Sequence, residues 1–341
     1  MLLKSSGYNL LIILIASFCF GSLSFHTPEQ KQHSISGKAQ GTTYLVLYYH
    51  EFKEIKHDQI DSILLLVDKS MSLYKDNSLI SKINRSKKGG MVDPLFLKVM
   101  QKAIAINKDT EGIFDITVAP LVAAWGFSYE KPKTLPDSTE IAAIMPFVGM
   151  KFIQLERGYL RKLKPEVKID LNGIAQGYTV DLISDFLLKQ GIENFLVEIG
   201  GELRVNGLKP TGDNFLIGIE GPVNSHNNDA MIKHTVVLKN QALTTSGSYR
   251  NYLLRNNLRL SHIIDPQTGY PVKSDILSVT VAAKDAITAD GYDNALLAMG
   301  IADAIKFVNA RREIDAYFVY LNGENKVADT MSSGFRKLLK N

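Results

Sequence analysis

Apolar residues recur along the chain with two different periods, which predicts a mixture of helices and strands. In several segments they lie three or four positions apart, the spacing of an amphipathic helix. Pro94 stands near the start of one such segment and Gly191 directly after another, as helix-start and helix-stop residues do. The predicted helices span residues 58–74, 94–108, 178–190, 290–299 and 302–309.

Strand patterns are more numerous than helix patterns. Residues 34–49 have the alternation of two paired strands, most clearly around Thr43, Leu45 and Leu47. We find no internal repeat and no linker that divides the chain into two domains. We therefore expect an α+β fold with substantial antiparallel sheet and packed helices. The other strand candidates are residues 195–199, 215–219, 235–238, 258–264, 276–282 and 316–321.

The composition of the 341 residues, 45% hydrophobic and 22% charged, is that of an ordinary folded protein. The formal net charge of +4 is spread along the sequence and forms no basic block. A role in nucleic-acid binding therefore has little support.

The N-terminus has the pattern of an export signal. Lys4 precedes an apolar run over residues 10–20, and small residues follow at Ser22 and Ser24. The run is short for a membrane span. We expect residues 1–24 to be a signal peptide or an N-terminal membrane anchor. The domain would then work in the periplasm or on the outer face of the cytoplasmic membrane.

The only cysteine, Cys19, lies inside this segment and suggests lipid attachment as a third fate. Phe18 directly before it is large for a lipidation signal, which favours cleavage or retention instead. The remainder of the chain has no cysteine, so it has no disulfide, no thiolate metal ligand and no cysteine nucleophile.

Residues 168–181 have the pattern of a strand, a glycine-bearing turn and a helix that begins around Gly177. Asp170 ends the strand, and Gly173 and Gly177 would let the backbone approach a bulky ligand. A helix start of this kind offers N–H groups and a dipole to a phosphate or pyrophosphate. The alternative is an ordinary strand-to-helix turn, which also carries glycine.

A second acidic motif opens the helix predicted over 290–299. Asp290 and Asn294 lie four residues apart, so both oxygens would face the same way on a helix. Oxygen ligands of this kind suit Mg²⁺, which takes few protein ligands and completes its shell with water and phosphate. The alternative for Asp290 is a helix N-cap, and the segment alone does not decide between them.

Two polar segments contain candidates for phosphate binding and for proton transfer. Ser246 begins a hydroxyl-rich run that ends in Arg250, which suits a phosphate but also an ordinary turn. His262 lies at the end of a strand beside the turn 265–269. This setting favours a ligand-binding role, although a lone histidine is more often structural.

Two further segments contain side chains of unclear role. Asp115 lies between apolar neighbours, where an unpaired carboxylate would be costly. Phe114 and Trp125 on either side of it are expected in the core. Tyr74 follows the first predicted helix and could stack on an aromatic ring.

Together these segments resemble the ApbE-type FAD:protein FMN transferases, over roughly residues 35–338. The resemblance implies a flavin-transferase (T-fold-like) domain over those residues, with FAD in a cleft and Mg²⁺ at its pyrophosphate. Seven segments match the family's signatures in order. They are residues 39–42, 71–78, 112–117, 170–181, 245–250, 262–269 and 288–295.

The resemblance also implies roles for individual residues. Asn294 stands where family members commonly have threonine, Gln40 where many have methionine, and Gln176 where many have lysine. The implied metal ligands are the Ala175 carbonyl and the side chains of Asp290 and Asn294. The implied FAD contacts, together with the phosphate candidate Ser246, are Gln40, Tyr74, Ile113, Phe114, Asp115, Asp170, Gly173, His262 and Ile263.

The implied reaction passes FMN from FAD to a threonine or serine hydroxyl of a partner protein, with AMP as leaving group. His262 is the candidate base, because its pKa is ordinarily near neutral, and Asp290 acting through a metal-bound water is the alternative. Two other functions fit the same residues. One is an FAD pyrophosphatase that yields FMN and AMP, and the other is a non-catalytic exported flavin-binding protein.

Overall fold

The computed structural model describes residues 30–128, 132, 134–221, 232–247, 252–255 and 258–340. The export or anchor segment predicted over residues 1–24 lies outside the described residues. Within the described part, no helix combines the length and the apolar character needed to cross a membrane.

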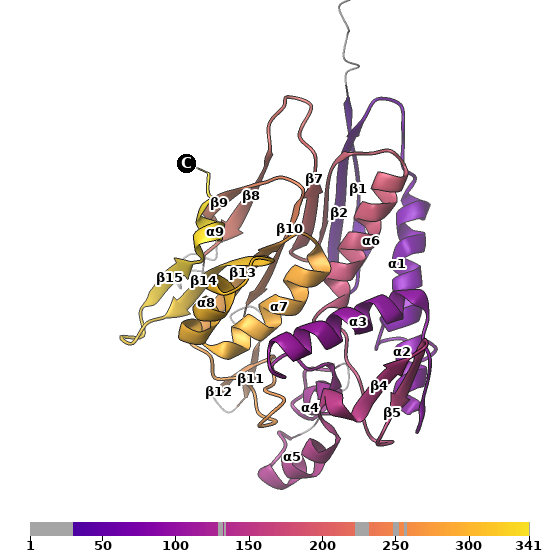
Figure 1. Cartoon of the computed structure of the whole chain (residues 1–341), viewed down its shortest axis with the longest axis vertical. Coiled ribbons are helices and arrows are strands. Elements are labelled where there is room, and N and C mark those ends of the chain that lie inside the picture. The colour runs from indigo at the N-terminus through magenta and orange to yellow at the C-terminus, as the bar shows by residue number, and fades with distance from the viewer. Residues whose placement is uncertain are drawn as a thin grey trace, which may run out of the picture.

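A large antiparallel sheet forms the centre of the molecule (Figure 1). Every neighbouring pair of its strands is antiparallel, which confirms the predicted α+β class. The first two strands form a tight hairpin, as the alternation over residues 34–49 predicts. In spatial order the strands are β1 (Lys31–Ala39), β2 (Thr42–His50), β6 (Asn194–Ile199), β7 (Glu202–Asn206), β10 (Gln241–Gly247), β13 (Ile276–Ala283), β14 (Ile314–Leu321) and β15 (Val327–Met331).

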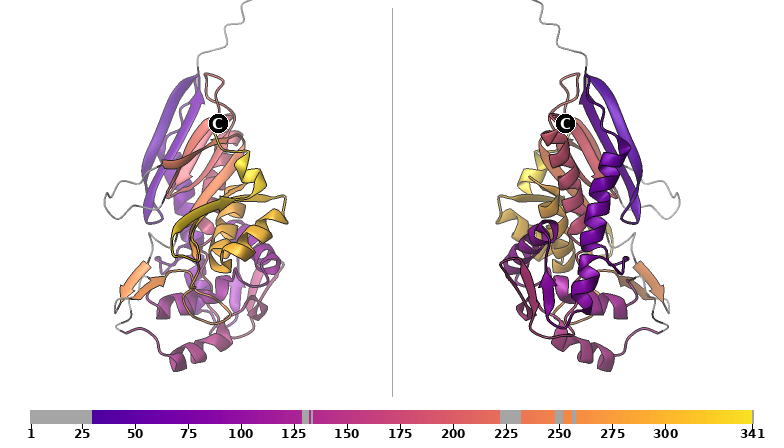
Figure 2. Two further views of the ribbon diagram at one scale, coloured as in Figure 1. Left: turned by 90° about the vertical axis from the view of Figure 1, so that its left-hand side faces the viewer. Right: turned by 90° about the vertical axis from the view of Figure 1, so that its right-hand side faces the viewer.

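Long helices cover one face of this sheet, and a hairpin with a short C-terminal helix packs on the other (Figures 1 and 2). Val46 and Phe195 pack toward the helices, whereas their strand neighbours Leu47 and Leu196 pack on the opposite side. The helices are α1 (His57–Met71), α3 (Pro94–Asp109), α6 (Ala175–Lys189), α7 (Ala286–Met299) and α8 (Ile301–Asn309). The opposite face carries β8 (Phe215–Glu220), β9 (Ile232–Leu238) and α9 (Ser333–Arg336).

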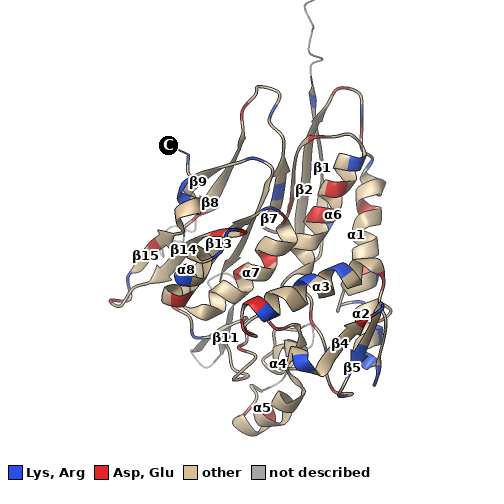
Figure 3. Ribbon diagram, viewed as in Figure 1, with Lys and Arg blue, Asp and Glu red and all other residues tan. Residues whose placement is uncertain are grey.

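A smaller region lies at the lower end of the molecule in Figure 1. It has its own apolar cluster, in which Trp125, Leu121 and Ile264 are buried. Its strands are β3 (Gly89–Met91), β4 (Ile153–Glu156), β5 (Tyr159–Lys162), β11 (Tyr252–Arg255) and β12 (Leu258–Ser261). Its helices are α2 (Leu79–Arg85), α4 (Ala119–Ala124) and α5 (Ser138–Ile144), with short 3-10 turns at Ile116–Val118, Met145–Phe147 and Met150–Phe152. Charges of both signs are distributed over the elements (Figure 3).

Candidate functional site

Helices α6 and α7 meet most closely at Gly177. Its N–H donates to Asp290 Oδ2 over 2.7 Å. A Cβ atom at this position would lie 2.4 Å from the Ala286 carbonyl oxygen and 2.7 Å from the Asp290 Cβ. The glycine is therefore needed for the approach of α7. Our expectation that Gly177 makes room for a ligand, and offers its N–H to a phosphate, is wrong.

Asp290 lies in the second turn of α7 and not at its start. The helix begins four residues earlier, and its N-cap is Asp285, whose carboxylate accepts from the Thr288 N–H. The N-cap alternative for Asp290 is therefore excluded. Only 4% of Asp290 is exposed, and burial raises the pKa of its carboxyl to about 7.

Asn294 lies one turn after Asp290 and faces the turn before α6. Its Nδ2 donates to the Gly173 carbonyl over 3.3 Å, to the Asp290 carbonyl over 3.1 Å and to Asp293 Oδ1 over 2.9 Å. Within the described part of the chain, these hydrogen bonds leave Asn294 Oδ1 available, and the bond from Gly177 occupies only one Asp290 oxygen. Asp290 Oδ1 and Asn294 Oδ1 are therefore two hard oxygen atoms that could bind a metal ion here.

This donor set fits Mg²⁺ better than a transition metal. Among the described residues, no group of three or more His, Cys, Asp or Glu side chains is arranged to hold a metal. Mg²⁺ needs only one or two carboxylates when water and phosphate complete its shell. The Ala175 carbonyl, the third predicted ligand, opens α6 and accepts the Thr179 hydroxyl over 2.7 Å.

Two further carboxylates, the buried Asp293 and the partly exposed Glu202, lie near Asp290, and sequence reasoning missed both as parts of the site. Burial and the neighbouring carboxylates raise both pKa values well above their usual range. Gln176, which replaces the family's frequent lysine, donates to Glu202 Oε2 over 2.6 Å. Asp293 accepts from the Thr244 hydroxyl over 2.8 Å. Both partners are neutral, so this concentration of acidic groups favours a cation.

Gln40 joins this site from the far edge of the sheet. It occupies the β1–β2 turn with Gly41, both at positive φ (51° and 81°), as a two-residue hairpin turn requires. Its Nε2 donates over 2.8 Å to Thr179 Oγ1, which donates to the Ala175 carbonyl. Gln40 Oε1 is buried and has no hydrogen-bond partner in the described part of the chain.

The segment 113–115 is held in the smaller region. Asp115 Oδ1 accepts from the Thr117 N–H over 2.7 Å and from the Thr117 hydroxyl, and its Oδ2 accepts from the Met150 N–H over 3.0 Å. These bonds explain why a carboxylate lies among apolar neighbours. Phe114 is buried in the main apolar cluster, and Ile113 packs against it. A flavin contact from this segment stays a prediction.

Asp170 and Ser246 lie on different elements. Asp170 Oδ1 accepts from the Asn172 N–H over 2.8 Å, and burial raises the pKa of this carboxyl. Ser246 lies within β10, two residues from Thr244, and so on the strand face that Thr244 presents to α7. The first residues of the run that begins at Ser246 therefore belong to a strand and not to a turn. Residues 248–250 lie outside the described part.

His262 and Ile263 directly follow β12. The His262 ring lies 6.5 Å from that of Phe127, centroid to centroid, and Ile263 packs against the main apolar cluster. The next turn is closed by Asp265, which accepts from the Gln267 N–H over 2.8 Å. Tyr74 lies in the loop after α1 and is 68% exposed. Hydrogen bonds thus join Gln40, Gly173, Ala175, Asp290 and Asn294 in one group, through Thr179 and Gly177.

Known proteins resemble this chain over most of its length. The model of the ApbE family matches residues 40–318. The FAD:protein FMN transferase of Haemophilus influenzae is 36% identical over 330 residues, covering 93% of this chain and 94% of that protein. The enzyme of the same name from Vibrio cholerae is 38% identical over 280 residues, covering 80% and 83%.

Solved structures agree with the sequence comparison. The flavin transferase ApbE from Vibrio cholerae superposes with a TM-score of 0.82 at 34% identity, covering 91% of this chain and all of that one. The apo flavinyl transferase ApbE from Pseudomonas stutzeri gives the same TM-score at 30% identity, covering 91% and 97%. Family match, sequence identity and fold all agree: the chain belongs to the ApbE family.

Proposed function

We propose that this protein transfers FMN from FAD to a serine or threonine hydroxyl of a partner protein. The acceptor oxygen attacks the phosphorus on the FMN side of the pyrophosphate. The bond between that phosphorus and the bridging oxygen breaks, and AMP leaves with the bridging oxygen. The hydroxyl proton passes to a base of the enzyme, and a phosphoester joins FMN to the partner.

The α6–α7 contact supplies the metal-binding part of this proposal. Asp290 Oδ1, Asn294 Oδ1 and the Ala175 carbonyl would hold Mg²⁺, with Glu202 and Asp293 behind them. Bound there, Mg²⁺ would neutralise pyrophosphate charge and favour departure of AMP. The buried Oε1 of Gln40, which needs a donor, supports a ligand at this end of α6.

Other residues would bind FAD and move the proton. Tyr74, the segment 113–115, Asp170, Gly173 and Ser246 are the proposed FAD contacts, as is Ile263. His262 is the proposed base, because a neutral imidazole can accept the hydroxyl proton. We further propose that the protein is exported through residues 1–24 and acts on a partner outside the cytoplasm.

The observation that carries the proposal is the pair of available oxygens at Asp290 and Asn294, one helical turn apart. Asp290→Asn keeps the shape and an acceptor for the Gly177 N–H but removes the charge. We expect it to abolish Mg²⁺-dependent AMP release from FAD without loss of helical circular dichroism. Asp303→Asn, at an exposed carboxylate on the neighbouring α8, is the matched control and should stay active. Undiminished turnover by Asp290→Asn would disprove the metal assignment.

A further inference from the structure

Helices α6 and α7 make polar contacts at three successive turns. Gly173, just before α6, accepts from the Asn294 side chain, and the Gly177 N–H donates to Asp290. One turn further along α6, the carboxylate of Asp181 meets the first residues of α7. Along α6 the contacts advance by four residues, from 173 to 177 to 181. Their partners along α7 go back by four residues, from 294 to 290 to 286, so the two helices run antiparallel.

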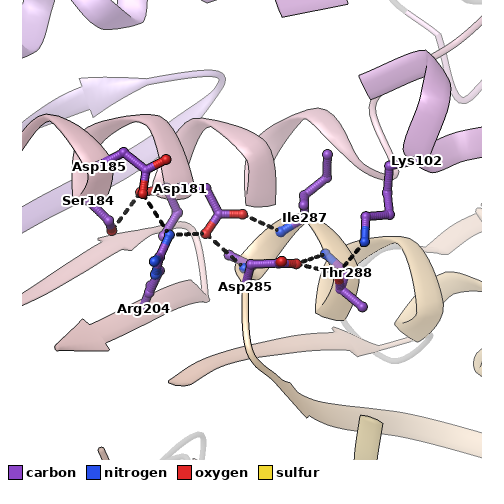
Figure 4. A network of polar contacts seen from close by, with 10 residues as sticks. Lys102, Asp181, Ser184, Asp185, Arg204, Asp285, Ile287 and Thr288 are labelled. Carbon is purple, nitrogen blue, oxygen red and sulfur yellow. Dashed lines mark hydrogen bonds and ion pairs between the residues drawn. The ribbon is translucent and has the colours of Figure 1, made fainter. Parts of the chain in front are cut away.

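In the last of these contacts, both carboxylate oxygens of Asp181 accept hydrogen bonds (Figure 4). Its Oδ1 accepts from the Ala286 N–H over 3.0 Å, and its Oδ2 from the Ile287 N–H over 2.9 Å. Arg204 of β7 donates to Oδ1 over 3.0 Å and also contacts the exposed Asp185. Asp181 itself is 6% exposed. A carboxylate on α6 is thus fixed from both sides, by a strand and by the start of α7.

Strand β7 holds α6 at a second point. Glu202 lies two residues before Arg204 and hence on the same strand face, and it accepts from the Gln176 side chain. The strand therefore contacts α6 at Gln176, beside the Ala175 carbonyl, and at Asp181. The strand fixes α6, and the contacts of Gly173, Gly177 and Asp181 with α7 then set the position of α7 along α6.

We propose that Asp181 is a positioning residue that sets the register of α7 against α6 and thereby the spacing of the metal ligands. The Ala175 carbonyl lies on one helix, and Asp290 and Asn294 lie on the other. This role rests on the proposed function, because it concerns the metal ligands of that reaction.

The close crossing at Gly177 makes the register sensitive to Asp181. Since a Cβ at Gly177 would already overlap the backbone of α7, the helices have no slack to absorb a shift there. Asp181→Asn would turn an amide N–H₂ either toward the Ile287 N–H or toward both the Ala286 N–H and Arg204, donor against donor. We expect α7 to shift, and supporting residues of this kind typically change metal affinity by roughly 10–100-fold.

The competing explanation is that Asp181 merely caps α7. Asp285 provides the matched control, because its carboxylate caps the same helix and, within the described part of the chain, hydrogen-bonds to Thr288 and not to a residue of α6. Asp285→Ala should lower the midpoint of thermal unfolding, as the loss of a helix cap does, and leave metal affinity unchanged. A cap role for Asp181 predicts the same for Asp181→Asn, whereas a positioning role predicts weaker metal binding.

The test is titration of Mn²⁺, as a paramagnetic substitute for Mg²⁺, into the purified protein with FAD and without any acceptor protein. Free Mn²⁺ is followed by electron paramagnetic resonance, and thermal unfolding is recorded on the same samples without metal. We expect the dissociation constant of Asp181→Asn to rise by about 10-fold or more, with wild-type values for Asp285→Ala. The affinity for FAD without metal should not change.

Equal Mn²⁺ affinity in wild type and Asp181→Asn would overturn the positioning role and leave the proposed function intact. Absence of Mn²⁺ binding by the wild type would instead overturn the metal assignment, and the positioning role with it. If Asp181→Asn does not fold, Arg204→Gln replaces it, because this change loosens Asp181 but keeps both backbone bonds. A wild-type Mn²⁺ affinity in Arg204→Gln would then overturn the positioning role.

Discussion

Asp290, Asp293 and Glu202 bring three acidic groups close together, and the first two are buried. In each of them desolvation raises the pKa, since burial disfavours the charged form. A bound cation would offset the free-energy cost of ionising these carboxylates, because each charged form then has an opposite charge nearby. The site is therefore expected to be less stable without metal and more stable with it.

A pH dependence of stability follows for the metal-free protein. The folded-state pKa of Asp290 is raised to about 7 and that of Asp181 to about 6. Such groups contribute stability that is complete below their unfolded pKa of about 4 and is lost as pH rises through the folded pKa. We expect the urea midpoint to fall between about pH 5 and pH 8.

Excess Mg²⁺ should reduce that fall, because the metal stabilises the ionised Asp290. Asp109 and Asp329, whose pKa values are lowered, act in the opposite direction but below the window used here. A midpoint that rises from pH 5 to pH 8 in the absence of metal would contradict this account of the carboxylates.

Tyr74 tests the proposed flavin contacts separately from the metal. With 68% of the residue exposed, its removal should cost little folding stability. If its ring stacks on FAD, Tyr74→Ala should weaken FAD binding by about 1–3 kcal/mol, on the scale of base–aromatic stacking. Fluorescence titration of FAD without Mg²⁺ measures this. Phe52→Ala, at another exposed aromatic, is the control, and equal affinities in all three proteins would remove Tyr74 from the site.

At the scale of elements, periodicity located the helices that present one apolar face. It predicted α3 to within one residue of its end. It placed the start of α7 four residues late, because residues 286–293 are all buried and leave no polar face to mark the helix. Asp285, the N-cap, was the residue in the sequence that could have marked the start of α7, but Asp290 was considered as the N-cap instead.

Polar residues on an inward face kept strand β7 from being predicted and hid the inward contacts of β10. In β7, Glu202 and Arg204 alternate with the buried Leu203 and Val205, yet both contact α6. In β10, Thr244 is buried because Asp293 accepts its hydroxyl. Their partners lie far away in sequence, so the pattern of the segments alone did not show that these polar side chains face inward.

Gly177 lies where α6 packs against α7, next to the proposed metal ligand Asp290. Gly177→Ala would place a Cβ against the Ala286 carbonyl at 2.4 Å, and we expect a loss of roughly 1–3 kcal/mol, as for overpacking. Weaker Mg²⁺ binding should accompany it. Urea unfolding gives the stability. Gly323→Ala, where nothing lies within 4 Å of the added atom, should unfold like the wild type. A neutral Gly177→Ala would show that the helices can separate without cost.

At the scale of the whole molecule, the site combines segments from most of the chain. Gln40 reaches Thr179, Asp290 reaches Gly177 and Thr244 reaches Asp293, although each pair is 49 to 139 residues apart. The sequence motifs identified many of these residues through the family resemblance. Their spatial contacts, and the part of Glu202 in the site, could not be predicted from spacing, because they depend on how the sheet brings the segments together.

The most direct test of the account is acceptor labelling. The domain is incubated with FAD, Mg²⁺ and a candidate acceptor protein carrying an exposed threonine or serine. We expect the acceptor to carry flavin fluorescence on a denaturing gel, with one AMP released for each FMN attached. The labelling should disappear when the acceptor residue is replaced by alanine. AMP and free FMN released at the same rate with or without acceptor, and no labelled protein, would contradict the transferase function and indicate hydrolysis of FAD.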